Sequence, residues 1–79
     1  MRVTIQYFAS LRDRRGLDHE VLEVEEGLSL RGLYHRLFPP DQPPPPPPVL
    51  FVLDEDYVSG ETALRDGCEA AFIPPLGGG

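Results

Sequence analysis

Cysteine is nearly absent from this sequence, because Cys68 stands alone among 79 residues. A single thiol excludes an internal disulfide, and it excludes a metal or iron–sulfur site built from several cysteines. No apolar run is long enough for a membrane span or a signal peptide. We therefore expect a soluble cytoplasmic protein that holds no metal and contacts no membrane.

Lysine is missing altogether, so all seven basic side chains are arginines, against 13 acidic side chains. The net charge of −6 opposes the phosphate neutralisation on which nucleic-acid binding depends, so we expect no nucleic-acid partner. An acidic surface suits a basic protein partner instead. A single domain of this size buries only about 60% of its unfolded surface. Any chemistry is therefore expected at an edge, a surface or a terminus.

Apolar periodicity predicts five strands and one main helix. The predicted strands cover 2–8, 19–24, 49–53, 57–58 and 69–73. In the first strand Val3, Ile5 and Tyr7 alternate with polar residues, as in a half-buried strand. The continuous apolar run 49–53 predicts the central buried strand. Segment 9–15 is short and charged, and we expect no more than one helical turn there.

The main helix is predicted after Ser29, a plausible N-cap. Its apolar residues recur at i, i+3, i+4 and i+7, and they are Leu30, Leu33, Tyr34 and Leu37. Pro39 ends the helix, because the residue before a proline is pushed out of the helical region. The prolines of segment 39–48 cannot donate to a sheet, so this segment is predicted to be an extended proline-rich loop.

Together these elements predict one α+β domain over residues 1–79, with the main helix packed on one face of a mixed sheet. The order of hairpin, helix and further strands suits a β-grasp fold, whose first and last strands lie parallel at the centre. A ferredoxin-like sandwich is the alternative. It needs a second helix, and segment 63–66 is too short to supply one.

The chain closes with Leu76 and three glycines. A glycine run does not favour folding, so one interpretation is a frayed tail or an expression remnant. The other is a flexible C-terminal tail, 76–79, that threads into a narrow channel of a partner. Pro74 and Pro75 favour the second interpretation, because they stop the last strand and stiffen the exit of the tail.

A threaded glycine tail delivers one reactive group, the α-carboxylate of Gly79. ATP converts a carboxylate into an acyl-adenylate, from which a sulfur donor displaces AMP. The product is a thiocarboxylate, a sulfur nucleophile at the end of a flexible arm.

The residues around this tail carry a resemblance to the ThiS/MoaD family of sulfur carriers, and within it to small subunits of molybdopterin synthase. The matching residues in the first half are Phe8, Ala9, Leu11, Arg12 and Gly16. Those in the second half are Leu64, Asp66, Gly67, Glu69, Ala71, Phe72 and Ile73. The ending 74–79 fits the family's Pro-Pro-x-x-Gly-Gly in register. The sequence departs from the family at Asp54, where asparagine is common, at Cys68 and in the proline run.

The resemblance implies a ubiquitin-like β-grasp fold and a C-terminal Gly79 that an E1-like enzyme of the MoeB type adenylates with ATP. A sulfurtransferase then loads sulfur onto Gly79. It also implies that Gly78 and Gly79 enter the large subunit of molybdopterin synthase, of the MoaE type, where the thiocarboxylate donates sulfur for molybdopterin. The chain is then not catalytic alone and holds no permanent cofactor.

Seven further residues are expected to contact these partners. Four lie beside or in the tail, and they are Pro74, Pro75, Leu76 and Gly77. Phe8, Tyr57 and Ile73 match family positions that form an apolar docking surface. The alternation along the strands agrees for two of the three, since Phe8 is expected to point away from Tyr7 and Ile73 away from Phe72.

Three other functions stay open from the sequence. One is a ThiS-type carrier for thiazole synthesis or a related thiolation. The second belongs to a different class, an interaction module whose proline run docks into SH3-like or WW-like grooves. The third is a β-grasp domain that is not conjugated and has no carrier role. Cys68 is expected to be inert, because nearby acids raise the pKa of a thiol. His19 and His35 lack partners at ligand spacing and are expected to be ordinary surface histidines.

Overall fold

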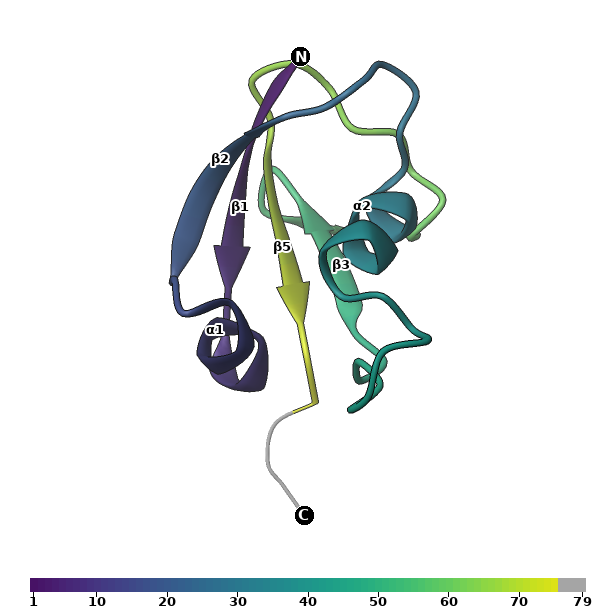
Figure 1. Cartoon of the computed structure of the whole chain (residues 1–79). Coiled ribbons are helices and arrows are strands. Elements are labelled where there is room, and N and C mark those ends of the chain that lie inside the picture. Colours follow the sequence, from purple (N-terminus) through teal and green to yellow (C-terminus); the bar gives the residue numbers. More distant parts are fainter. Residues whose placement is uncertain (76–79) are drawn as a thin grey trace.

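A computed structural model describes residues 1–75, and within that range it contains a five-stranded sheet and two helices (Figure 1). In chain order the elements are β1 (Arg2–Tyr7), α1 (Ala9–Arg15), β2 (His19–Glu23), α2 (Leu30–Leu37), β3 (Leu50–Leu53), β4 (Asp56–Val58) and β5 (Glu69–Ile73). The strand order is β2-β1-β5-β3-β4, with β1 and β5 parallel and the other pairs antiparallel. This is the predicted β-grasp fold. Neither described helix is long and apolar enough to cross a membrane.

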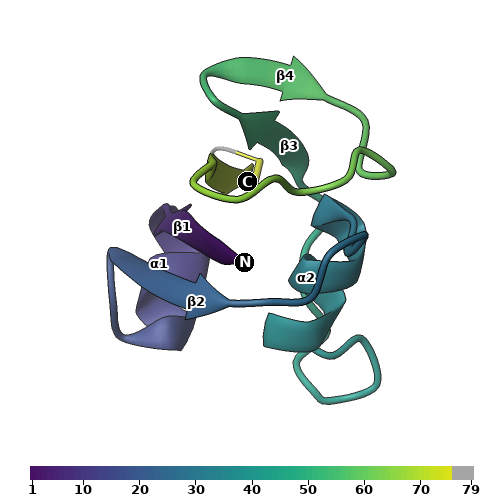
Figure 2. The same cartoon turned by 90° about the horizontal axis from the view of Figure 1, so that it is seen from above.

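The sheet has one covered and one uncovered face, because successive side chains of a strand point to opposite sides. Val3, Ile5 and Tyr7 are buried on the covered face, as predicted. In the parallel pairing of β1 with β5, Ile5 lies opposite Ala70 and Tyr7 opposite Phe72, and all four are buried. Figure 2 shows α2 on one side of the curved sheet. Strands β2 and β4 form the two edges of the sheet.

Helix α2 begins and ends where the sequence predicted. The hydroxyl oxygen of Ser29 accepts a hydrogen bond from the backbone N–H of Gly32 at 3.0 Å, which caps the first turn. Leu30, Leu33 and Tyr34 are buried against the sheet. The helix ends one residue before Phe38, which precedes Pro39 and has left the helical region.

Helix α1 corrects the prediction of at most one helical turn over 9–15. It has seven residues and buries Leu11 completely. Gly16 ends it in the left-handed region, at φ 74°, and donates its N–H to the carbonyl of Arg12. Most helix stability in proteins comes from packing of an apolar face, and one fully buried leucine supplies that packing here.

The apolar run 49–53 is not the central strand, and this prediction was wrong. The central strand is β5, which lies between β1 and β3. Strand β3 alternates like an ordinary half-buried strand, with Phe51 and Leu53 buried and Leu50 59% exposed. The apolar side chains that do not enter the core therefore lie on the uncovered face of the sheet.

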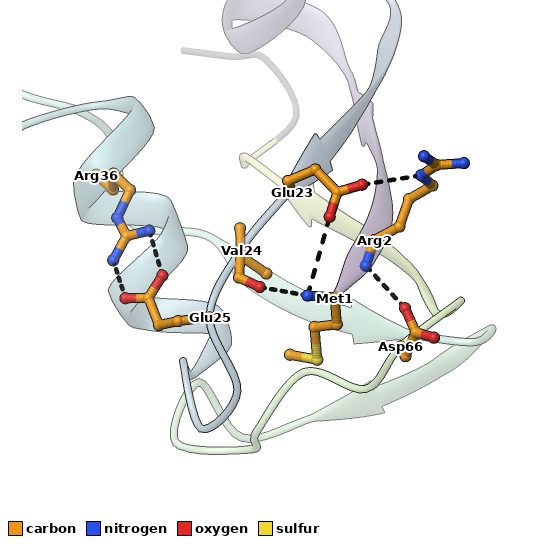
Figure 3. Close-up of polar contacts among 7 residues, drawn as sticks. All are labelled: Met1, Arg2, Glu23, Val24, Glu25, Arg36 and Asp66. Carbon is orange, nitrogen blue, oxygen red and sulfur yellow. Dashed lines mark hydrogen bonds and ion pairs between the residues drawn. The ribbon is translucent and has the colours of Figure 1, made fainter.

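Polar contacts close the end of the sheet where β1 and β5 begin (Figure 3). The backbone N–H of Arg2 donates to Oδ1 of Asp66 at 2.8 Å, and the backbone N–H of Gly67 donates to the carbonyl of Arg2 at 2.7 Å. The nitrogen of Met1 donates to the carbonyl of Val24 at 2.7 Å. The predicted Asp-Gly turn thus fixes the start of β5 against the start of β1, and Pro75 leaves from the opposite end.

Candidate functional site

The uncovered face of the sheet carries a shallow hollow that brings Phe8, Tyr57 and Ile73 together. Its remaining lining residues are Gln6, Val52, Glu55, Glu69, Ala70 and Ala71. Phe8 is 41% exposed and Tyr57 72% exposed, although both are large apolar side chains. Exposed apolar side chains gathered in one patch are typical of interaction sites. The three residues predicted to dock a partner therefore lie where one partner surface can cover all three.

Register places these side chains on the same face. In the antiparallel pairing of β3 with its neighbours, Val52 lies opposite both Tyr57 of β4 and Ala71 of β5. Directly paired residues share a face of the sheet. Phe8 comes one residue after β1, in an extended conformation with φ −130° and ψ 150°, and forms the N-cap of α1. The side chain consequently continues the alternation of β1 and points away from Tyr7.

Acidic side chains border this hollow. Glu55 and Glu69 belong to its lining, and Oε1 of Glu69 accepts a hydrogen bond from Nε2 of Gln6 at 2.7 Å. Asp54 instead makes contacts within the protein. Its Oδ1 accepts a hydrogen bond from the backbone N–H of Glu69 at 2.9 Å, and its Oδ2 pairs with Arg65 at 2.7 Å. An apolar centre bordered by carboxylates suits a partner with apolar and basic groups.

The turn between β3 and β4 explains one departure from the family pattern. Asp54 and Glu55 both have positive φ, 47° and 74°. Asparagine and aspartate enter this region more readily than other residues with a side chain. Aspartate therefore serves at position 54 where the family commonly has asparagine, and it adds the two contacts just described.

A second hollow lies beside the exit of the tail. Its lining residues are Pro48, Val49, Leu50, Tyr57, Ile73, Pro74 and Pro75. Tyr57 and Ile73 line both hollows, so the two are neighbours on the same surface. Sequence analysis missed Pro48, Val49 and Leu50. The available signal was the position of Leu50 within its strand, since alternation with Phe51 places it on the same face as Ile73.

The predicted tail residues divide between the described and undescribed parts of the chain. Pro74 is buried and Pro75 is exposed, immediately after β5 ends at Ile73. Leu76, Gly77, Gly78 and Gly79 lie outside the described residues. The described part of the site is thus the docking surface and the point where the tail begins.

The remaining candidate residues have ordinary structural places. Cys68 is free, and only 4% of it is exposed, within the hydrophobic core. His19 and His35 are exposed, and Nδ1 of His19 lies 3.0 Å from a carboxylate oxygen of Asp18. Residues 1–75 contain no group of three or more histidine, cysteine, aspartate or glutamate side chains arranged to hold a metal.

Comparison with known proteins gives consistent matches along the whole chain. The sequence model of the ThiS family matches residues 5–79. A molybdopterin synthase sulfur carrier subunit from Chlamydomonas reinhardtii is 31% identical over 83 aligned positions, which cover all of both chains.

Solved structures with similar folds include the following two. The putative molybdopterin converting factor, subunit 1, from Pyrococcus furiosus has a TM-score of 0.73 and 25% identity, over 96% of this chain and 99% of that chain. The complex of subunits 1 and 2 of the molybdopterin-converting factor from Helicobacter pylori has a chain with a TM-score of 0.60 and 16% identity, over the whole of both chains. At 16% identity, the second likeness shows the fold alone.

Proposed function

The chain belongs to the ThiS family, and from this premise we propose that it is the sulfur carrier of molybdopterin synthesis, with Gly79 as the residue that carries the sulfur. The observation that carries the proposal is the full-length match to the Chlamydomonas sulfur carrier subunit, which extends through both termini of both chains. A carrier for thiazole synthesis shares the family, but the name of this relative favours molybdopterin.

The proposed chemistry takes place at the carboxyl group of Gly79. A carboxylate oxygen attacks the α-phosphorus of ATP and releases pyrophosphate, which leaves an acyl-adenylate. A sulfur nucleophile at the oxidation level of sulfide, such as hydrosulfide, then attacks the acyl carbon, AMP leaves, and a thiocarboxylate remains. Its sulfur passes to the molybdopterin precursor, and attack of water on the acyl carbon regenerates the carboxylate for another cycle. The chain supplies the loaded group and the docking surface, whereas its partners supply the catalysis.

We propose three partners for this cycle. An E1-like enzyme adenylates the tail with ATP in the cytoplasm, and a sulfurtransferase provides the sulfur. The large subunit of molybdopterin synthase receives the loaded tail, as the subunit 1 and 2 complex from Helicobacter pylori suggests. The surface of Phe8, Tyr57 and Ile73 supports docking, because these side chains leave apolar area exposed on the uncovered face.

Intact mass measurement tests the proposal. The purified chain is incubated with an E1-like activating enzyme, ATP and a sulfur source. A carrier gains the mass of one oxygen-to-sulfur exchange, and fragmentation maps the gain to the C-terminal peptide. A variant without Gly78 and Gly79 is the control and should stay unmodified. A full-length chain that never gains sulfur, with activating enzymes shown to load other carriers, overturns the proposal.

A further inference from the structure

The proline-rich loop is tied to the body of the protein by its own backbone carbonyls. The hydroxyl of Tyr34 donates to the carbonyl oxygen of Pro47 at 2.5 Å. The guanidinium of Arg14 donates to the carbonyl of Pro44 at 2.8 Å and also reaches that of Pro45 at 3.4 Å. These donors come from different helices, α2 and α1. The loop is therefore held along its second half.

This attachment affects how the proline run can act. Grooves that bind polyproline helices use the exposed backbone carbonyls and the proline rings of an extended segment. Here Arg14 and Tyr34 already occupy carbonyls at Pro44 and Pro47. The guanidinium of Arg14 also lies 5.6 Å from the centre of the Phe38 ring, which keeps it over the core. These contacts indicate that the proline run is an integral part of the domain and not a free ligand for another module.

The fixed loop leads directly into the hollow beside the tail exit. Pro48 follows the Tyr34 contact by one residue and lines the hollow with Val49 and Leu50. In the antiparallel pairing of β3 with β5, Leu50 lies opposite Ile73, and it remains 59% exposed. The seven lining residues include no charged side chain. An occupant of this hollow must therefore present apolar groups.

The length of the tail determines what covers the hollow. Four residues, 76–79, follow Pro75. Even fully extended, four residues span at most about 14 Å. A protein that takes up Gly79 must therefore bring the mouth of its channel within that distance of Pro75, which lines the hollow itself. The surface around the channel mouth then lies against Pro48, Val49 and Leu50.

We propose that the proline-rich loop forms one wall of the docking surface, and that Pro48, Val49 and Leu50 bind an apolar rim around the tail channel of the receiving protein. This inference rests on the proposed function, because it takes the receiving protein to be the large subunit of molybdopterin synthase. The hollow continues the surface of Phe8, Tyr57 and Ile73 through the two residues that they share. Tyr34 and Arg14 act as positioning residues, since they hold the wall through the carbonyls of Pro47 and Pro44.

The test compares two charge insertions at apolar strand positions of similar exposure. Leu50→Asp puts a carboxylate into the hollow. Val21→Asp is the matched control, because Val21 is 56% exposed on β2 and lines neither hollow. Calorimetry with the purified large subunit measures affinity for sulfur-loaded chains. We expect Leu50→Asp to weaken binding by about tenfold or more, because it places an unpaired charge inside the interface. We expect Val21→Asp to weaken binding by less than about twofold.

Circular dichroism on each variant separates loss of binding from loss of folding. If Leu50→Asp does not fold, Leu50→Ser replaces it, with Val21→Ser as its control. Equal affinities for wild type and the folded Leu50 variant overturn the inference, while sulfur loading of the wild type still upholds the proposed function. Self-association of the free chain that Leu50→Asp abolishes also overturns it, because a second copy then covers the hollow. A wild-type chain that takes up no sulfur overturns the proposed function instead.

Discussion

The hydroxyl of Tyr34 donates a hydrogen bond to the carbonyl oxygen of Pro47, 13 positions further along the chain, at 2.5 Å. This contact joins α2 to the proline-rich loop. Desolvation by burial raises the pKa of Tyr34 to about 12. The folded state therefore favours the neutral phenol. Its contribution to stability is complete below pH 10, near the pKa of an exposed tyrosine, and is lost as pH rises towards 12.

Removal of this hydroxyl tests the attachment of the loop. Tyr34→Phe should lower the free energy of unfolding by about 1 kcal/mol at pH 7, because it leaves the Pro47 carbonyl without its donor. Tyr57→Phe makes the same change on an exposed ring and should stay within about 0.5 kcal/mol of wild type. Urea unfolding from pH 7 to pH 11 measures both. If the difference in unfolding free energy between Tyr34→Phe and wild type widens above pH 10, the hydrogen bond from Tyr34 to Pro47 is contradicted.

The ion pair between Glu25 and Arg36 predicts a loss of stability in acid (Figure 3). Arg36 donates to both carboxylate oxygens of Glu25, at 2.9 and 2.5 Å. These hydrogen bonds lower the pKa of Glu25 from 4.5 to about 2. The stabilisation is therefore present above pH 4.5 and disappears as pH falls towards 2. Glu25→Gln should be less stable than wild type at pH 7 and nearly equal to it at pH 2, as measured by urea unfolding.

The neighbouring Glu26 provides the control for this measurement. Glu26 is also exposed, and Glu26→Gln removes the same charge without touching the pair of Glu25 and Arg36. This variant should keep the acid dependence of the wild type. Because the pair is at the surface, salt should reduce the effect of Glu25→Gln. An effect of the same size in 1 M salt speaks against a Coulombic origin.

Leu11 tests whether α1 belongs to the core. It is the only buried residue of α1 and is fully buried. Leu11→Ala should reduce the free energy of unfolding by about 2–5 kcal/mol, through lost burial and the cavity that remains. Ser10→Ala, at the exposed neighbouring position, should change it by no more than about 0.5 kcal/mol. A loss below about 1 kcal/mol for Leu11→Ala means that α1 is a marginal element, as the sequence had indicated.

The fold was predictable because its strongest signals are local. Alternation at Val3, Ile5 and Tyr7 predicted both the strand and its buried face, and Ser29 predicted the start of the main helix. The same alternation predicted the docking surface. Phe8 and Ile73 each follow a buried residue, so their side chains point to the opposite face of the sheet. Local periodicity thus decided which side chains line the first hollow once the strand order was known.

Features that depend on distant contacts were not predictable in this way. The helix of Ala9–Arg15 is short and charged. It forms because Leu11 packs into a hydrophobic core whose other residues come from other elements. A continuous apolar run such as 49–53 looks the same in a buried strand and in one whose exposed face is an interaction surface. The role of the proline-rich loop depends on Tyr34, whose contact with Pro47 no local pattern encodes.

The absence of lysine predicts how the activated chain behaves when no sulfur is supplied. Acyl-adenylates react with free amines, but the chain has no lysine, and the guanidinium of each arginine stays protonated. The thiol of Cys68 is buried in the core. The nitrogen of Met1 is hydrogen-bonded to Val24 at the end of the sheet opposite Pro75. That end lies beyond the reach of about 14 Å available to four tail residues.

We therefore expect the activated chain not to form a cyclic product. Incubated with an activating enzyme and ATP alone, it should not show the loss of water that marks an amide bond between Gly79 and Met1 of the same chain. Hydroxylamine added to the same reaction should give a hydroxamate at Gly79, which proves that the carboxylate was activated. Intact mass and denaturing electrophoresis distinguish these species. An amide bond to Met1 in a product with the mass of one chain, found by peptide mapping, contradicts the prediction, because it requires an amine that the fold holds away from the tail.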